Sequence, residues 1–213
     1  GVALALVPGA LLAGLYLMFD VYRAKPDLVP WLLLRIAMTA GFVALVEEFL
    51  FRGVLLGLAA KAFGHWRAAA GVSLAFAGVH FLRPGKQADS VVEWWSGFAQ
   101  IIGFVDAVPP PWLFLAGFVS LLVAGLVLAV ATLWTRSLWL AIGLHGGWIF
   151  CQQTLQWLAR YRIKPPDAFW PWIGPNVVGG AVPTGLFPLG ALVLTGLGVW
   201  YYLRNASADS RGS

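Results

Sequence analysis

The sequence predicts an all-α, polytopic membrane protein, a helix bundle of about six transmembrane spans. Of its 213 residues 60% are hydrophobic and only 11% are charged, whereas a soluble domain carries about 25% charged residues. The apolar residues form long stretches separated by short polar turns. Backbone polar groups inside lipid must be satisfied within their own segment, so such stretches are expected to be helices packed in one bundle.

Six stretches approach the roughly 20 apolar residues that a helix needs to cross a bilayer. They are residues 2–19, 31–60, 68–82, 112–134, 137–159 and 185–203. The first lacks a preceding basic segment and exceeds the usual apolar core of a signal peptide, so we interpret it as a retained span. The third is the shortest. We expect a single domain over residues 1–204 and a polar, disordered tail over 205–213.

The connections between the spans are proline-rich or charged. The connection at 83–111 ends in three consecutive prolines, which stop a helix, and leaves room for short interfacial helices. Several tryptophans stand at predicted span ends, as interfacial anchors do. The expected bundle has its other connections at residues 20–30, 61–67 and 160–184.

The net charge of +5 does not indicate nucleic-acid binding, because the 14 lysines and arginines form no run or patch. They occur singly or in pairs between apolar stretches, where loops would face lipid head groups. With six spans, Lys61 and Arg136 fall on one side of the membrane, and Arg23, Lys25 and Arg160 on the other. The single cysteine excludes an intramolecular disulfide and a Cys-rich metal site.

Five ionisable residues lie deep inside the predicted spans: Glu47, Glu48, Arg52, His80 and His145. Charged groups in hydrocarbon are costly, so they face the bundle interior, pair with one another or serve a function. Glu48 and Arg52 are four residues apart on one helix face, which predicts an ion pair. Glu47 points about 100° away and remains free to act as a general base.

The depths of the remaining groups agree. At about 1.5 Å per residue, Glu47 lies roughly 20 Å before residue 60, His80 roughly 18 Å after residue 68, and His145 roughly 13 Å after Arg136. Three spans therefore bring one carboxylate and two imidazoles to a common layer. The residues by themselves leave open a hydrolytic site, a proton or ion pathway, a metal site, or core histidines that are simply hydrogen-bonded.

Three short motifs resemble those of the CAAX protease and bacteriocin-processing family (CPBP, also called Abi proteins), which are glutamate-dependent intramembrane endopeptidases. Residues 47–52 match its Glu-Glu-x-x-x-Arg motif, and residues 76–80 match its Phe-x-x-x-His motif. His145 and its run-in resemble the third motif, a histidine followed four residues later by Asn or Asp. Ile149 stands at that fourth position and departs from the family.

The resemblance implies that Glu47, helped by His80, activates a water for attack on a peptide carbonyl. It also implies that His145 donates a hydrogen bond to the developing oxyanion, a task that the family's Asn shares. Ile149 cannot donate. Either another donor such as Trp148, Gln152 or Gln153 replaces it, or activity is lower, or the chain is a non-enzymatic membrane scaffold or immunity protein.

The resemblance favours a site without cofactor or metal, although Glu47, His80 and His145 could form a three-ligand zinc site. A proton-coupled transporter is a third interpretation, which the absence of an internal repeat does not support. The expected partners are a peptide or membrane-protein substrate and the lipid bilayer, with no nucleic acid. The expected location is a bacterial inner membrane, with the chain crossing it several times.

Overall fold

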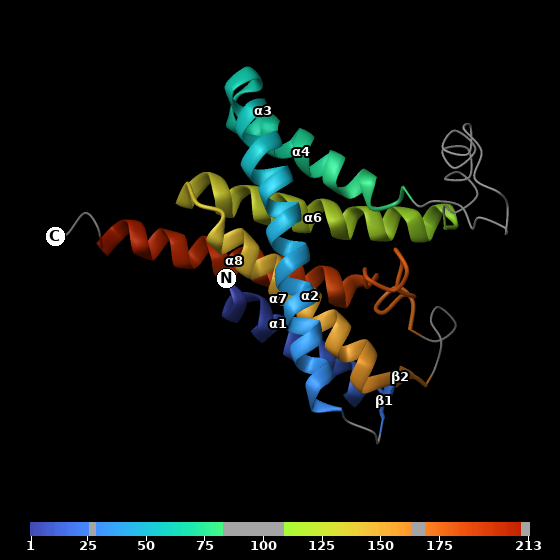
Figure 1. Cartoon of the computed structure of the whole chain (residues 1–213). Helices are drawn as coiled ribbons and strands as arrows, with labels where there is room; N and C mark the ends of the chain where they lie inside the picture. The colour runs from blue at the N-terminus through green and yellow to red at the C-terminus, as the bar shows by residue number, and fades with distance from the viewer. Residues whose placement is uncertain (26–28, 83–108, 163–168, 210–213) are drawn as a thin grey trace, which may run out of the picture.

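The computed structural model describes residues 1–25, 29–82, 109–162 and 169–209, and it confirms the all-α prediction (Figure 1). The helices in chain order are α1 (Val2–Met18), α2 (Pro30–Glu48), the π-helix η1 (Phe49–Leu55), α3 (Leu56–Phe63), α4 (His65–Val79), α6 (Pro111–Thr135), α7 (Trp139–Leu158) and α8 (Leu186–Asp209).

Two short strands, β1 (Tyr22–Ala24) and β2 (Ala159–Tyr161), were not predicted. They pair antiparallel with Arg23 opposite Arg160, so two basic residues predicted for the same side of the membrane lie together. The strands join the end of α1 to the end of α7. Each strand has only three residues, which is too short for an alternating pattern to be recognised in the sequence.

Within the described residues two helices, α6 and α8, are long and apolar enough to cross a membrane. The apolar α1 is shorter, and α2 carries Arg35 together with its two glutamates. Six spans therefore remain a prediction. The interfacial helices expected in the connection at 83–111 fall mostly on residues outside the described ones, and α8 continues to Asp209, into the segment expected to be a disordered tail.

The helix boundaries follow from local chemistry. Pro30 and Pro111 begin α2 and α6, where a missing N–H and a fixed φ are tolerated. Gly64, with φ of 81°, is the single residue between α3 and α4, so the predicted turn at 61–67 is much tighter than expected. Arg136 ends α6 in the left-handed conformation, with φ of 53°.

The segment predicted as one helix over residues 31–60 is continuous, but it contains the seven-residue π-helix η1 directly after Glu48. π-Helical turns are rare and frequently occur at functional sites. Phe51 and Arg52, both buried, lie within it. The change from α to π geometry therefore occurs in the first of the three motifs.

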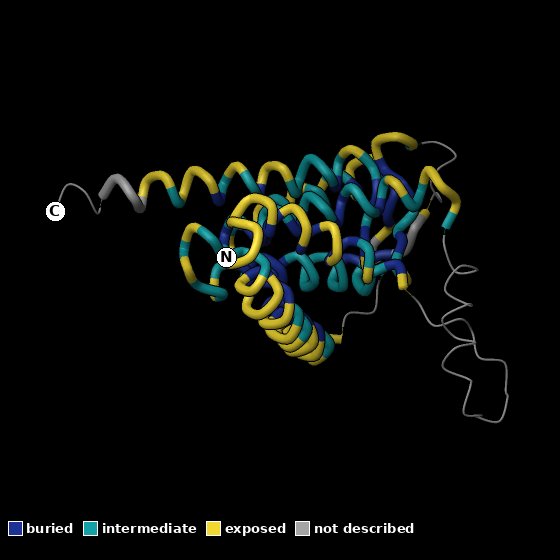
Figure 2. Tube along the Cα trace, turned by 90° about the horizontal axis from the view of Figure 1, so that it is seen from above, coloured by how far each residue is buried: buried dark blue, intermediate teal, exposed yellow. Residues whose placement is uncertain are grey.

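The helices pack so that α4 lies against α6, while α7 lies between α2 and α1 (Figure 1). α8 packs on α1 and α6. At the contact of α4 with α6, a Cβ built on Gly125 would lie 3.0 Å from the Cβ of Ser73, so any larger residue would require Ser73 to shift by a few tenths of an ångström. Figure 2 shows that exposed residues cover the outward faces of the helices and that buried residues face the interior.

Candidate active site

An ion pair between Glu48 and Arg52 lies at the centre of the bundle. Arg52 Nη1 is 2.9 Å from Glu48 Oε1, and both side chains are completely buried. Arg52 Nη2 also donates to the carbonyl of Gly125 on α6, at 3.3 Å. The guanidinium lies 4.3 Å from the ring centroid of Phe76, a cation–π contact. The pair predicted from the spacing is confirmed, and it ties α2, η1, α4 and α6 together.

Glu48 has a second partner that the sequence did not predict. His145 Nδ1 on α7 lies 2.8 Å from the same Oε1 atom. A carboxylate oxygen accepts, so the imidazole carries its hydrogen on Nδ1 here. One buried carboxylate therefore connects the first motif to the third, and it orients the His145 ring as well as neutralising Arg52.

Glu47 faces both histidines. Its Oε2 atom lies 3.8 Å from His80 Nε2 and 3.9 Å from His145 Nε2. The same oxygen is buried and has no hydrogen-bond partner among the described residues. The two imidazole nitrogens are too far for a direct hydrogen bond to the carboxylate but near enough for a bridging water. The structure thus brings together the carboxylate and two imidazoles whose depths agree in the sequence.

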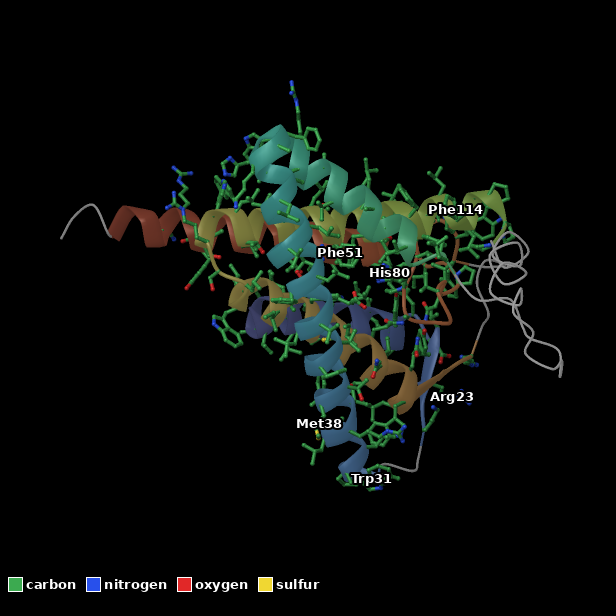
Figure 3. All side chains as sticks on the ribbon, turned by 45° about the horizontal axis from the view of Figure 1, so that its top comes forward. Arg23, Trp31, Met38, Phe51, His80 and Phe114 are labelled. Atoms are coloured by element: carbon green, nitrogen blue, oxygen red, sulfur yellow. The ribbon has the colours of Figure 1, made fainter. Side chains whose placement is uncertain are left out.

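The His80 ring is held by its own helix. His80 Nδ1 lies 2.6 Å from the carbonyl oxygen of Phe76, which can only accept, so Nδ1 carries the hydrogen. The Phe76 ring packs on His80 at 4.5 Å and on His145 at 5.8 Å between centroids. In Figure 3 the labelled Phe51 lies on the helix that contains η1, and His80 lies at the end of α4. The phenylalanine of the second motif therefore contacts three of the charged or titratable groups.

A cavity of about 300 Å³ opens in front of these groups. Glu47, His80 and His145 line it beside the Phe76 ring, and most of the remaining wall consists of apolar residues of α1, α6, α7 and α8, with a few polar side chains such as Gln152 and Gln153. A cavity of this size with a few convergent polar groups is typical of a site for a ligand or substrate. Glu48 and Arg52 do not line it, so they act on it only through their neighbours.

Comparison with protein families identifies the chain. The sequence model of the type II CAAX prenyl endopeptidase Rce1-like family matches residues 29–151, more than half of the chain. The chain belongs to this family. The match includes all three motifs, from Glu47 to His145. Comparisons with curated proteins and with solved structures gave no match.

The departure at Ile149 lies in the wall of the same cavity. Gln152, which also lines the cavity, follows His145 by seven residues, or about two helical turns, and so shares its helix face. The Gln152 amide donates to the carbonyl of Gly180 at 3.2 Å. Trp148 and Gln153, the other two donors suggested by the sequence, line the cavity as well.

The described residues contain no group of three or more His, Cys, Asp or Glu with the geometry of a metal site. Two features of the site escaped the sequence reasoning, namely the hydrogen bond from His145 to Glu48 and the π-helix. Neither has a sequence signal, because the first joins residues 97 positions apart and the second is a small change of helical geometry.

Proposed function

We propose that this chain is an intramembrane endopeptidase that hydrolyses a peptide bond in or next to the membrane without a covalent intermediate. The observation that carries the proposal is the position of Glu47 Oε2, which faces the Nε2 atoms of His80 and His145 at 3.8 and 3.9 Å in the wall of a cavity. Membership of the CAAX endopeptidase family supports a peptide as the substrate.

The tautomers of the two histidines support a hydrolytic role. Both Nδ1 atoms donate, His80 to the carbonyl of Phe76 and His145 to Glu48, so a neutral His80 ring has the lone pair of its Nε2 on the side of Glu47. A water between Glu47 and His80 can then donate one hydrogen to the carboxylate and one to the imidazole. General-base activation requires one base within reach of the proton that it takes, here Glu47, and the second acceptor orients the water.

In the proposed reaction the water oxygen attacks the carbonyl carbon while Glu47 takes the proton. The tetrahedral intermediate collapses when the carbon–nitrogen bond breaks, and Glu47 returns the proton to the leaving amine. Glu47 thus acts first as base and then as acid. No atom of the protein is bonded to the substrate at any step.

His145 can act as the oxyanion donor only in one protonation state, which the sequence did not imply. Its Nδ1 hydrogen is engaged by Glu48, so its Nε2 atom can donate to an oxyanion only when the ring carries both protons. The Glu48 carboxylate at 2.8 Å stabilises that imidazolium, as the aspartate of a serine-protease triad does for its histidine. Loss of one oxyanion donor typically lowers the rate by about 10²–10³-fold.

A non-enzymatic membrane scaffold or immunity protein is the second candidate, and Ile149 is the observation that favours it. An isoleucine supplies no hydrogen bond at the position where family members have Asn or Asp. Gln152 is the best placed replacement, since it lines the cavity on the same face of α7. To act, its amide would have to leave the carbonyl of Gly180.

The test uses the purified protein in liposomes together with membrane proteins of its host. New peptide termini are identified by mass spectrometry for the wild type, for Glu47→Gln and for Arg67→Gln. Arg67 is exposed and lies outside the cavity, so it is the control for a loss of charge. Termini produced by the wild type and the control but not by Glu47→Gln support the endopeptidase. Identical termini in all three samples favour the scaffold.

A further inference from the structure

A second cavity, of about 570 Å³, lies at the end of the bundle where α3 meets α4 and α6 meets α7. Its polar lining is basic or neutral. Lys61 lies in the last turn of α3, His65 begins α4 and Arg136 caps the end of α6, while Arg52 contributes from the bundle interior. No aspartate or glutamate is among the described residues that line it. It shares no residue with the cavity of the candidate active site.

The second cavity lies at the level where lipid head groups would be. Arg136 directly follows the apolar span α6. Three strongly exposed tryptophans flank the basic residues, Trp66 at the start of α4, Trp134 near the end of α6 and Trp139 at the start of α7. Exposed tryptophans next to span ends mark the membrane–water interface.

The charges in the second cavity are not equivalent. Arg52 is neutralised by Glu48, yet its buried Nε–H has no partner among the described residues. Lys61 and Arg136 are exposed, and neither forms an ion pair within the described part of the chain. The cavity therefore has two uncompensated positive charges at its rim and an unsatisfied buried donor on its inner residue.

The backbone conformation of Arg136 indicates separately that this residue belongs to a functional site. Its φ of 53° lies in the left-handed region, where a helix end usually has glycine. An arginine there is uncommon, and residues in such conformations cluster at functional sites. The Thr135 hydroxyl lies 2.7 Å from the carbonyl oxygen of Ala131 and 3.0 Å from that of Ser137, and its one hydrogen bonds to either or is shared between them. The turn therefore has a hydrogen bond that does not depend on arginine.

We propose that this second cavity binds a phosphate-bearing anion, held by Lys61 and Arg136. Lysine and arginine are the side chains that form strong charge-assisted hydrogen bonds with phosphate oxygens. In a membrane the source is the head group of an anionic phospholipid, because basic clusters at this level attract such lipids. The hydroxyls of Thr132 and Ser137 line the same cavity and add neutral polar groups.

The test measures melting temperature in a neutral detergent while phosphatidylglycerol, phosphatidylcholine or inorganic phosphate is titrated in. The variant Lys61→Gln with Arg136→Gly removes both charges. It keeps the fold, because glycine relieves the left-handed strain and Lys61 is exposed. The matched control is Arg67→Gln, an exposed basic residue of α4 that does not line the cavity.

We expect phosphatidylglycerol to stabilise the wild type and the control at the same concentration, and phosphatidylcholine to have a smaller effect. The double variant should need at least about tenfold more phosphatidylglycerol, as expected when two charge-assisted contacts are lost. Inorganic phosphate that stabilises with the same dependence on Lys61 and Arg136 would support the site and name free phosphate as its ligand. Equal responses of all three proteins, or none to any anion, would overturn the proposal.

Discussion

Glu48→Gln is the most informative single substitution in this chain, because one buried oxygen atom of Glu48 contacts both Arg52 and His145. The change removes one negative charge with almost no change in volume. Arg52 then remains charged, completely buried and without its counter-ion. Breaking a buried pair in this way typically costs about 3–5 kcal/mol. For a chain of this size 1 kcal/mol corresponds to about 2–4 °C, so we expect a loss of roughly 6–20 °C in Tm.

Thermal unfolding in detergent, followed by circular dichroism, measures this loss. The matched control is Glu47→Gln, the same chemical change at the adjacent residue. The Glu47 side chain is 30% exposed and has no direct hydrogen-bond partner for Oε2 among the described residues, so its Tm should change by less than about 2 °C. The double variant Glu48→Gln with Arg52→Met should recover part of the loss, because no buried charge is then left alone.

Activity gives a second and separate readout for Glu48. At a temperature where the variant is fully folded, its turnover should still fall, because a neutral amide stabilises the imidazolium of His145 less than a carboxylate does. If Glu48→Gln has the same Tm as the wild type, the buried pair of Glu48 and Arg52 does not stabilise the fold. If Glu48→Gln is stable and inactive while Glu47→Gln is unstable and active, the roles of the two glutamates are reversed.

Three further predictions concern the site and its support. Glu47→Gln should keep the fold and lower turnover by about 10²–10⁴-fold, the usual contribution of a general base, measured on any peptide that the wild type cleaves. A chelator should leave that activity intact, and elemental analysis should find no stoichiometric zinc; zinc near one per chain, lost together with activity, would favour the three-ligand zinc site. Gly125→Ala should lower the free energy of unfolding by about 1–3 kcal/mol, because the added methyl lies 3.0 Å from Ser73. In the same melting assay Gly71→Ala, whose methyl would have nothing within 4 Å, should be neutral or stabilising. Equal effects of the two substitutions would contradict the close packing of α4 on α6.

The sequence by itself determined the helical class, most helix positions and the pairing of Glu48 with Arg52. These depend on local rules, namely the length of apolar stretches, the positions of proline and glycine, and the 3.6-residue period that puts residues four apart on one face. The same period puts Glu47 on a different face of the helix from Glu48 and Arg52. Counting residues from the span ends also brought Glu47, His80 and His145 to a similar depth, which needs no knowledge of how the helices pack.

Only the tertiary structure decided which atoms meet. Depth along three helices does not say how each helix is rotated, so the sequence could not reveal that His145 hydrogen-bonds to Glu48 and faces Glu47 with its other nitrogen. The second cavity has the same origin, because Lys61 in α3 and Arg136 at the end of α6 are far apart in the chain and line one cavity only in the folded protein. Such contacts depend on how each helix is rotated and how closely the helices approach one another. The packing of side chains, such as Ser73 against Gly125, determines both, and no local sequence pattern encodes them.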